Sequence, residues 1–559
     1  MSNKEIARSF KLAATLLELH DDNPFKARSL QGAAFKLERI PSPISTMTEE
    51  EISKLEGVGK SIQSKIQEYL QRKSFTELDT LLEKTPEGVV QMLSIKGIGP
   101  KKVRVLWNEL GIETPGELLY ACNENRLVEL KGFGNKTQEL IRKAIEYTQS
   151  NEGKFLYAVV ERIAKDLEKD LKASGFVKDF SFTGDLRRNC EIIETLEIVL
   201  SSSDKNKLID FLQTHPLLDA DSIVVSNNEI DAKIVGKLRL KIFIIEEKSF
   251  TQKLFSTTGS RSHLEILKNE YGWDEKQQSD SEQEIYSSLN LPFIAPELRE
   301  GLFEFKMAKS KSMPMLIQTS DLKGILHNHT TYSDGEHTLA EMADYCKELG
   351  YEYLGICDHS KSAFYANGLQ PERIVQQQIE IDVLNKKLTP FRIFKGIESD
   401  ILIDGSLDYP DEILSTFDFV VASIHSILRM DKEKATQRLI RAVENRYTTI
   451  LGHPTGRLLL AREGYPIDHE KVIDACATNG VIIELNANPY RLDLDWRFLQ
   501  YALNKNVMIS INPDAHRKEG YHDMHYGVCV ARKGGLTTEM TFNSLSCQEI
   551  EKHFAKRRV

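Results

Sequence analysis

The sequence predicts a multidomain chain with an α-helical N-terminal region, a small α+β domain and a C-terminal seven-stranded α/β barrel. In residues 1–150, apolar positions recur every three or four residues in segments such as "IARSFKLAATLLELH" and "SIQSKIQEYL", which is typical of amphipathic helices. Between residues 155 and 245, short apolar runs indicate strands instead. From residue 321 onward, seven apolar runs alternate with helical segments. This alternation favours a closed or nearly closed parallel barrel over an open doubly wound sheet.

Size and composition limit the class of protein. The chain has 559 residues, 41% of them hydrophobic, which is enough for several packed domains. Its formal net charge of −10 argues against a wholly basic nucleic-acid coat, although local basic surfaces remain possible. The seven cysteines form no CxxC pair, as expected of reduced thiols inside a cell. Without a signal peptide or a long apolar segment, we expect a soluble, cytoplasmic protein.

One short pattern, apolar–x–Gly–apolar–Gly, occurs three times in the helical region, each time directly before an amphipathic helix. A single copy fits an ordinary helix–helix turn, but three copies favour helix-hairpin-helix motifs that bind the DNA backbone without recognising sequence. Glycines permit the tight hairpin, and backbone N–H groups at the helix start can bind a phosphate oxygen. The candidate DNA-binding residues are Gly57, Gly59, Lys60, Gly97, Gly99, Lys101, Lys102, Gly132, Gly134 and Lys136.

Residues 1–315 resemble family X DNA polymerases, because "TGDLRRNCE", "TTGSRSH" and "EQEIYSSLNLPFIAPELREG" follow the hairpins in that family's order. The resemblance implies a lyase-like domain at 1–85, a fingers-like domain at 86–150 and a nucleotidyltransferase-like palm and thumb at 151–315. It also places Lys65 where the lyase domain has its Schiff-base lysine. The alternative is an ordinary solvated lysine on a helix face.

The palm departs from this family at the positions that bind the catalytic metals. The family's Asp-x-Asp is Thr195-Leu196-Glu197 here, and the resemblance puts Lys241 in place of a third aspartate. Two-metal phosphoryl transfer requires clustered carboxylates, so we predict that the palm is an inactive scaffold. The residues of this degenerate site are Asp185, Arg187, Arg188, Thr195, Glu197 and Lys241.

Histidines and acidic residues stand at the ends of six of the seven apolar runs in the last domain, and the seventh run ends with Asn486 and Asn488. The C-terminal ends of barrel strands meet at one rim, where active sites lie. So many unpaired ionisable groups would be costly there, and bound cations remove the cost. Imidazole with carboxylate suits Mn²⁺, Zn²⁺ or Fe²⁺, in a cluster of two or three ions. The candidate ligands are His327, His329, Asp334, His359, Glu398, His425, His453, Asp514 and His516.

This set resembles the PHP (polymerase and histidinol phosphatase) domain, over about residues 321–559, and implies a distorted barrel with a trinuclear site. The implied partition is His327, His329, Glu398 and Asp514 for one ion, Glu398, His425 and His453 for a second, and Asp334, His359 and His516 for a third. His337 competes with Asp334 in its loop. Arg457 and Arg517 are candidate phosphate contacts, with surface ion pairs as the alternative. In the rim loop at 360–369, Phe364 or Tyr365 is placed to stack on an unpaired base.

Together the two halves resemble bacterial family X polymerases with a C-terminal PHP domain, a family in which the PHP domain removes nucleotides from 3′ ends with Mn²⁺. We therefore expect a monomeric DNA-repair phosphoesterase that acts on gapped, nicked or 3′-ended DNA, as a 3′–5′ exonuclease or a 3′-end or abasic-site processing enzyme. Three alternatives stay open: an active gap-filling polymerase, a small-molecule phosphatase of histidinol-phosphatase type, and a non-catalytic DNA-binding scaffold.

Overall fold

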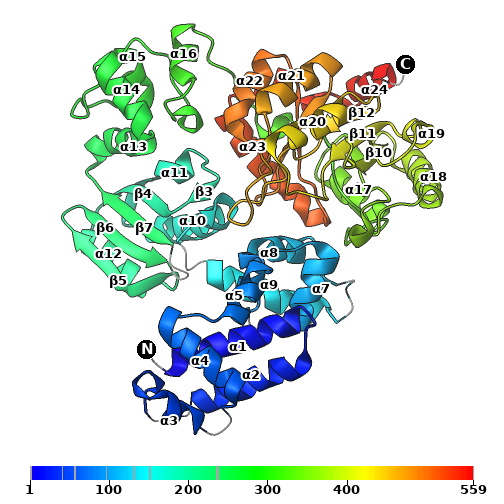
Figure 1. Ribbon diagram of the computed structural model, residues 1–559. Coiled ribbons are helices and arrows are strands. Elements are labelled where there is room, and N and C mark those ends of the chain that lie inside the picture. Colours follow the sequence, from blue (N-terminus) through cyan, green and yellow to red (C-terminus); the bar gives the residue numbers. More distant parts are fainter. Residues whose placement is uncertain are drawn as a thin grey trace. The chain divides into compact units, whose positions relative to one another are not determined.

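The computed structural model describes residues 3–38, 40, 42–55, 58–95, 97–128, 130, 132–149, 153–234 and 238–557. The chain forms two compact units, Met1–Glu146 and Tyr147–Val559 (Figure 1). Among the described residues, no helix is both long enough and apolar enough to cross a membrane. Each unit is considered separately below.

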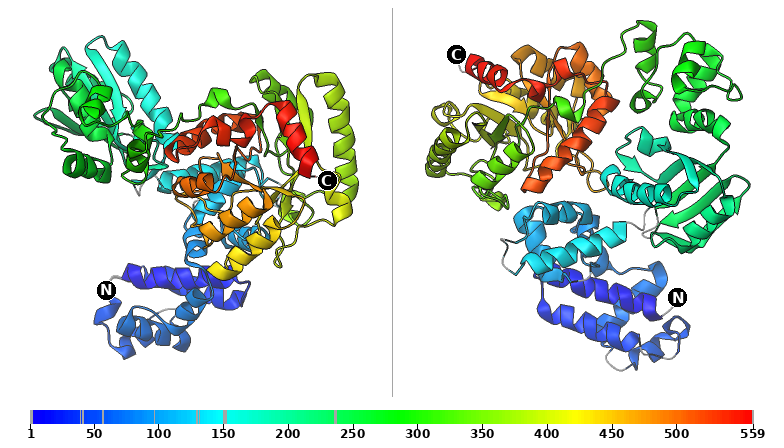
Figure 2. Two further views of the ribbon diagram at one scale, coloured as in Figure 1. Left: turned by 90° about the horizontal axis from the view of Figure 1, so that it is seen from above. Right: turned by 180° about the vertical axis from the view of Figure 1, so that it is seen from behind.

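Helices and their connecting turns make up the described part of the first unit. The amphipathic segments expected here are confirmed as α1 and α4. Helices α1 and α2 lie side by side (Figure 2), and the ring of Phe10 on α1 packs 5.1 Å from that of Phe75. The elements are α1 (Asn3–Leu19), α2 (Pro24–Leu37), α3 (Glu49–Ser53), α4 (Lys60–Arg72), α5 (Thr76–Glu83), α6 (Glu87–Met92), α7 (Pro100–Leu110), α8 (Pro115–Asn123) and α9 (Asn135–Gln149).

A five-stranded mixed sheet opens the second unit, in the order β2-β4-β7-β6-β5. Strands β4 and β7 are parallel, whereas the other neighbours are antiparallel. The predicted strands are all present, and β6 is an additional one that alternates buried and less buried residues. The elements are β1 (Phe155–Leu156), α10 (Tyr157–Ala173), β2 (Val177–Thr183), α11 (Gly184–Arg187), β3 (Ile192–Ile193), β4 (Thr195–Ser202), α12 (Lys205–Thr214), β5 (Leu218–Ser226), β6 (Glu229–Ile234) and β7 (Arg239–Ile244).

Four helices with a core of their own follow this sheet. Phe255, Leu267 and Tyr286 are buried at the centre of that core. Residues 307–320, which lack helical periodicity in the sequence and were expected to form a linker, begin within the last of these helices and then pack on the barrel, where Ile317 is fully buried. The helices are α13 (Phe250–Thr258), α14 (Arg261–Tyr271), α15 (Glu282–Ser288) and α16 (Glu304–Lys309).

The seven apolar runs after residue 321 form the seven-stranded parallel sheet that the sequence predicts, with strands β8 to β14 in chain order. A parallel bridge between Asn328 and Ala515 joins the segments after the first and last strands, so the barrel is nearly closed. Its elements are β8 (Gly324–Ile325), α17 (Leu339–Glu348), β9 (Tyr353–Ile356), α18 (Pro371–Leu388), β10 (Arg392–Asp400), α19 (Asp411–Leu414), β11 (Phe419–Ser423), α20 (Lys432–Val443), β12 (Thr448–Leu451), α21 (His469–Asn479), β13 (Ile482–Asn486), α22 (Leu499–Asn504), β14 (Ile509–Asn512), α23 (Met524–Lys533) and α24 (Cys547–Arg557).

Candidate metal centre and nucleic-acid interface

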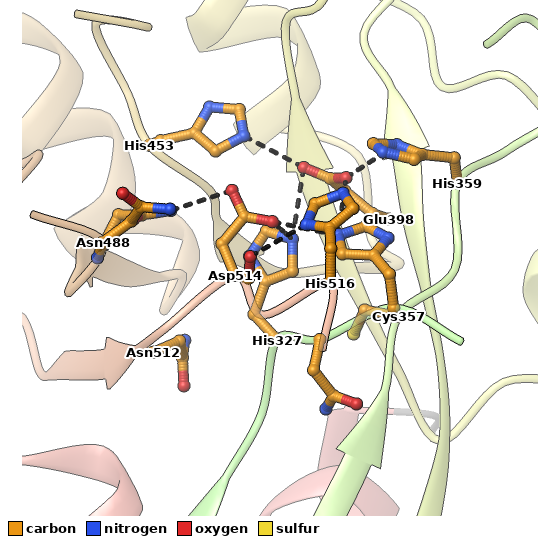
Figure 3. Close-up of polar contacts among 12 residues, drawn as sticks. His327, Cys357, His359, Glu398, His453, Asn488, Asn512, Asp514 and His516 are labelled. Carbon is orange, nitrogen blue, oxygen red and sulfur yellow. Dashed lines mark hydrogen bonds and ion pairs between the residues drawn. The ribbon is translucent and has the colours of Figure 1, made fainter. Parts of the chain in front are cut away.

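The predicted metal ligands come together at the C-terminal rim of the barrel. Glu398 lies near the end of β10, and His425, His453 and Asp514 each follow a strand by two residues. Because neighbouring parallel strands end at the same edge, the side chains meet although they are far apart in the sequence. Figure 3 shows Glu398 between His453 and His359, with Asp514 close by.

Five imidazoles surround the carboxylate of Glu398, which is fully buried. The distances from Glu398 Oε1 are 3.0 Å to His453 Nε2, 3.1 Å to His425 Nε2 and 3.3 Å to His327 Nε2, and those from Oε2 are 2.9 Å to His359 Nδ1 and 3.7 Å to His329 Nε2. One carboxylate cannot accept a hydrogen bond in good geometry from each of the five rings, because its two oxygens offer only about four lone pairs. A carboxylate at this position is suited to bridge cations that the imidazoles bind.

Two further carboxylates complete the arrangement. Oδ1 of Asp514 lies 3.0 Å from Nε2 of His329 and 3.5 Å from Nε2 of His327. Oδ1 of Asp334 lies 3.3 Å from Nε2 of His516 and 3.6 Å from Nε2 of His359. The side chains of these two aspartates are at most 8% exposed.

Three groups of side chains bring their ligand atoms close enough to hold an ion each. The groups are His329, Asp334, His359 and His516; His327, His329 and Asp514; and His359, Glu398 and His425. These groups differ from the expected partition, because His359 also joins Glu398 and His425, His329 also joins Asp334, and Glu398 is absent from the group of His327 and Asp514. His453 is in none of the three groups, but its Nε2 lies 3.0 Å from Oε1 of Glu398. Among the described residues, Asp334 rather than His337 joins such a group.

The donor set fits divalent cations. Nε2 of His327 and Oε2 of Glu398 are buried, and none of their close contacts with the described residues has the geometry of a hydrogen bond. Burial of such atoms is costly, and a cation bound between nitrogen and oxygen ligands would satisfy both. The residues present therefore suit Mn²⁺, Zn²⁺ or Fe²⁺.

The histidines of the cluster differ in pKa because their electrostatic surroundings differ. Burial, followed by the charges of His516 and His359, lowers the pKa of His329 to about 3. Burial also acts to lower the pKa of His425, but the carboxylates of Glu398 and Asp400 raise it to about 9. Burial alone would raise the pKa of Glu398, whereas His425 and the other imidazoles hold it well below its ordinary value. The carboxylate of Glu398 is therefore ionised at neutral pH.

Several buried residues that contact the predicted ligands were not predicted from the sequence. Glu484 accepts a hydrogen bond from Nδ1 of His327 at 2.7 Å, and Asp400 accepts one from Nδ1 of His425. Arg491 Nε lies 3.5 Å from Oδ2 of Asp514. Glu484 lies within β13 and Asp400 is the last residue of β10, and no motif in the sequence marks either acid as the partner of a predicted ligand.

Asp358, next to His359, holds the loop that carries Asp334. Its carboxylate accepts hydrogen bonds from the backbone and hydroxyl of Thr330 at 2.8 and 2.7 Å, and from Nε2 of Gln377 at 2.6 Å. It also accepts from the N–H of Ser333 at 3.1 Å. These contacts fix the loop at the rim before any ion binds.

The three candidate catalytic residues outside the cluster have different surroundings. Arg457 donates to Asp495 at 2.7 Å and to the carbonyl of Arg491 at 2.9 Å, which favours an ion pair over a phosphate contact. Lys65 contacts Glu77 at 3.2 Å, as expected of an ordinary helix-face lysine. Arg517 is exposed immediately after His516 and stays a candidate phosphate contact.

In the palm, the structure puts a cation and a half-buried acid where the resemblance expects two metal-binding acids. Glu197 of β4 pairs in register with Lys241 of β7, and Lys241 forms an ion pair with Glu229 at 2.8 Å. The Glu197 carboxylate covers Gly184, where a Cβ would lie 1.8 Å from its Oε2. Burial, and then the charge of Asp185, raises the pKa of Glu197. Thr195 begins the strand and offers only a hydroxyl group.

The two palm arginines that match the family are engaged within the protein. Arg187 and Arg299 both bind the carboxylate of Glu282, at 2.7 and 2.6 Å. Arg188 binds Asp185 at 2.5 Å and Glu300 at 3.0 Å. Their guanidinium groups therefore neutralise carboxylates of the protein itself, of which that of Glu282 is buried.

Helices α4, α7 and α9 each begin directly after the second glycine of a predicted hairpin. Gly59 and Gly99 are the N-caps of α4 and α7 and provide no side chain to bind the first-turn N–H groups. Gly97 and Gly132 have φ of +101° and +90°, a backbone conformation that favours glycine.

Space is open around the hairpin glycines. A Cβ at Gly59, Gly97, Gly99, Gly132 or Gly134 would meet nothing within 4 Å. Lys60, Lys101 and Lys136 are exposed, and Lys102 lies over the ring of Phe133 at 5.3 Å. Open backbone N–H groups flanked by lysines are suited to bind phosphate. Gly57 lies outside the described residues.

Comparison with known proteins agrees with this architecture. A helix-hairpin-helix domain family matches residues 1–75, a SAM-like helix-hairpin-helix tandem residues 89–146, and the PHP domain residues 326–488. A DNA polymerase/3′-5′ exonuclease PolX from Bacillus subtilis (strain 168) is 36% identical over 575 residues, which cover 100% of both chains. A probable phosphatase from Thermoanaerobacter sp. (strain X514) is 28% identical over 242 residues, 40% of this chain and 91% of that protein. A probable phosphatase from Acetivibrio thermocellus is 33% identical over 171 residues, 29% of this chain and 65% of that protein.

The barrel and its cluster define a metal-dependent phosphoesterase of the PHP class, joined to helix-hairpin-helix domains and to the domain of the five-stranded sheet. Because the similarity to PolX covers the full length, it assigns the whole chain to one family. The protein belongs to the PolX family, the family X DNA polymerases with a C-terminal PHP domain.

Proposed function

We propose that the protein hydrolyses DNA phosphoesters at the 3′ end of a strand, as a 3′–5′ exonuclease or 3′-end or abasic-site processing enzyme. It acts in DNA repair as a monomer on gapped, nicked or 3′-ended DNA, and its palm is an inactive scaffold. The proposed domains are 1–85, 86–150, 151–315 and 321–559. The observation that carries the proposal is the convergence of five imidazoles on the buried carboxylate of Glu398.

The nine rim residues would hold two or three divalent ions, of which Mn²⁺ is one candidate. When bound, such ions activate a water molecule and neutralise the phosphoryl oxygens as negative charge develops. Glu398 would bridge ions, while Asp400 and Glu484 keep His425 and His327 in fixed orientations. Arg517 stands at the rim to bind a phosphate oxygen.

The palm supports the second part of the proposal. Lys241 repels a cation from the position where an aspartate would attract it, and Glu197 fills the space over Gly184. The arginines that match the polymerase family bind Glu282 and Glu300 instead of a triphosphate. The palm therefore offers neither a place for the metals nor one for the substrate.

A direct test uses an oligonucleotide labelled at its 5′ end, incubated with Mn²⁺ and the purified protein. We expect stepwise shortening from the 3′ end that stops with a chelator and falls at least 100-fold in His359→Ala. The matched control His553→Ala changes a histidine of α24 away from the cluster. Hydrolysis of phosphoamino compounds without any shortening of DNA would instead support a small-molecule phosphatase.

A further inference from the structure

The loop after His359 presents an exposed aromatic ring beside the cluster. Phe364 is 85% exposed, and the ring of the adjacent Tyr365 lies 6.2 Å from that of His359. A phenyl ring that is exposed to water does not contribute the favourable free energy that its burial would provide. A ligand that covers the ring when it binds would gain this free energy of burial.

The loop that carries Phe364 is firmly anchored. The N–H of Ser362 donates to Asp408 at 2.7 Å, and its hydroxyl donates to Asp400 at 2.7 Å. Both aspartates are buried. The carboxylate of Asp400 also accepts a hydrogen bond from His425, so the loop and the cluster share one anchor.

The two ends of the loop are held together at Ser360. Ser360 forms a bridge with Leu369, and a Cβ at Gly368 would lie 1.9 Å from the carbonyl oxygen of Ser360. The two ends of the loop are therefore held together by backbone contacts and by the absence of a side chain at Gly368. This arrangement leaves the side chain of Phe364 in solvent. A ring held on a fixed loop loses little conformational freedom when a ligand covers it.

We propose that Phe364 is a stacking platform for the base next to the scissile bond of an unpaired 3′ end. The proposal rests on the proposed function and names the ligand that the rim recognises. Every nucleobase has a π-face, so stacking tolerates any sequence. A small phosphoester without a base gains nothing from the ring, and the platform thus selects nucleic acid over other phosphoesters.

The test compares wild-type protein, Phe364→Ala and Phe364→Trp with Mn²⁺ on three substrates. These are a single-stranded oligonucleotide, the same strand with abasic residues at its 3′ end, and glycerol phosphate, a small phosphoester without an aromatic ring. Met315→Ala is the matched control, since Met315 is 86% exposed in the segment before the barrel. Fluorescence of 2-aminopurine at the 3′ end, measured without added metal, reports stacking independently of hydrolysis.

Phe364→Ala should lower kcat/KM on the normal oligonucleotide about 10-fold, chiefly through KM. It should leave the other two substrates unchanged and abolish the 2-aminopurine quenching, and Phe364→Trp should restore both. An equal loss on all three substrates, or no loss on the oligonucleotide, would overturn the platform. If the wild-type protein hydrolyses only glycerol phosphate, the proposed function itself is wrong.

Discussion

Oε2 of Glu484 lies 2.7 Å from Nδ1 of His327, and both side chains are fully buried. The other oxygen of Glu484 accepts hydrogen bonds from the N–H of His453 at 3.1 Å and from Nδ2 of Asn486 at 3.0 Å. One carboxylate thus fixes the ring of His327 with Nε2 turned toward the cluster. Partners of this kind orient metal ligands and tune their basicity.

Glu484→Gln should therefore weaken metal binding at the cluster by about 10- to 100-fold, because His327 loses its fixed orientation. Metal content after dialysis against buffered Mn²⁺, measured by mass spectrometry, checks this without relying on activity. The control Glu470→Gln changes an exposed residue in the first turn of α21 and should leave the content unchanged. Equal metal affinity in wild-type protein and Glu484→Gln would contradict the positioning role.

Lys533 joins the barrel to the palm. Its side chain is 1% exposed, forms an ion pair with Glu300 and donates to the carbonyl of Arg188 at 3.1 Å. Lys533→Met would leave the Glu300 carboxylate, whose side chain is only 16% exposed, with less compensating charge, and should lower the free energy of unfolding by about 3 kcal/mol.

Urea unfolding followed by circular dichroism measures the effect of Lys533→Met. The control is Lys505→Met, because Lys505 is 41% exposed and pairs with an exposed Asp474, so its loss should cost less than about 1 kcal/mol. Similar losses in the two variants would show that the contact of Lys533 with the palm does not stabilise the protein.

Glu282 should make the stability of the palm and its following helices depend on pH. Burial would raise its pKa, but Arg299 and then Arg187 lower it to about 2. A pKa lowered by folding adds stability that is present above the unfolded value near 4.5 and is lost as pH falls toward 2. The shift corresponds to roughly 3 kcal/mol at neutral pH.

Urea unfolding of wild-type protein and Glu282→Gln at pH 7 and pH 3.5 tests this dependence. The difference in free energy of unfolding should be large at pH 7 and should shrink at pH 3.5. Glu270→Gln, at a side chain that is 53% exposed, serves as the control. A difference that stays constant with pH would rule out ionised Glu282 as its source.

Gly99→Ala should separate DNA binding from stability in the second hairpin. Gly99 has φ of −97° and open space around it, so alanine fits the fold and should cost less than about 1 kcal/mol. The added methyl group would obstruct a phosphate at the start of α7. We expect the affinity for gapped duplex DNA, measured by fluorescence anisotropy, to fall about 10-fold.

The control for this variant is Gly32→Ala, at another glycine with open space but within α2. It should leave DNA affinity unchanged and add stability, because alanine favours a helix interior. Unchanged DNA affinity in Gly99→Ala would show that the hairpin does not bind the backbone.

The sequence predicts the barrel well because its seven apolar runs are short, similar and regularly separated, and each becomes one parallel strand. The nine rim residues are recognisable because histidine is rare at strand ends. Glu484 and Asp400 escape notice because an acid within a strand gives no sign of the partner it faces across the barrel. The ion pairs of Arg187 with Glu282, Arg188 with Glu300 and Arg457 with Asp495 are equally invisible, since these partners lie 38 to 112 residues away.

Strand β6 shows a different limit of prediction from the sequence. Its sequence "EIDAKI" alternates polar and apolar residues, but half of it is charged, so the pattern alone does not separate a strand from a loop. The palm sheet around it supplies the backbone partners that decide the structure.

The central claim is that the barrel is active and the palm is a scaffold. The most direct measurement uses a one-nucleotide-gapped duplex labelled on the primer strand, incubated with Mn²⁺ with and without dNTPs. Wild-type protein, His359→Ala and Glu197→Ala are compared. The account predicts primer shortening that is lost in His359→Ala and kept in Glu197→Ala, with no extension by dNTPs. Primer extension by the wild-type protein that disappears in Glu197→Ala would contradict it.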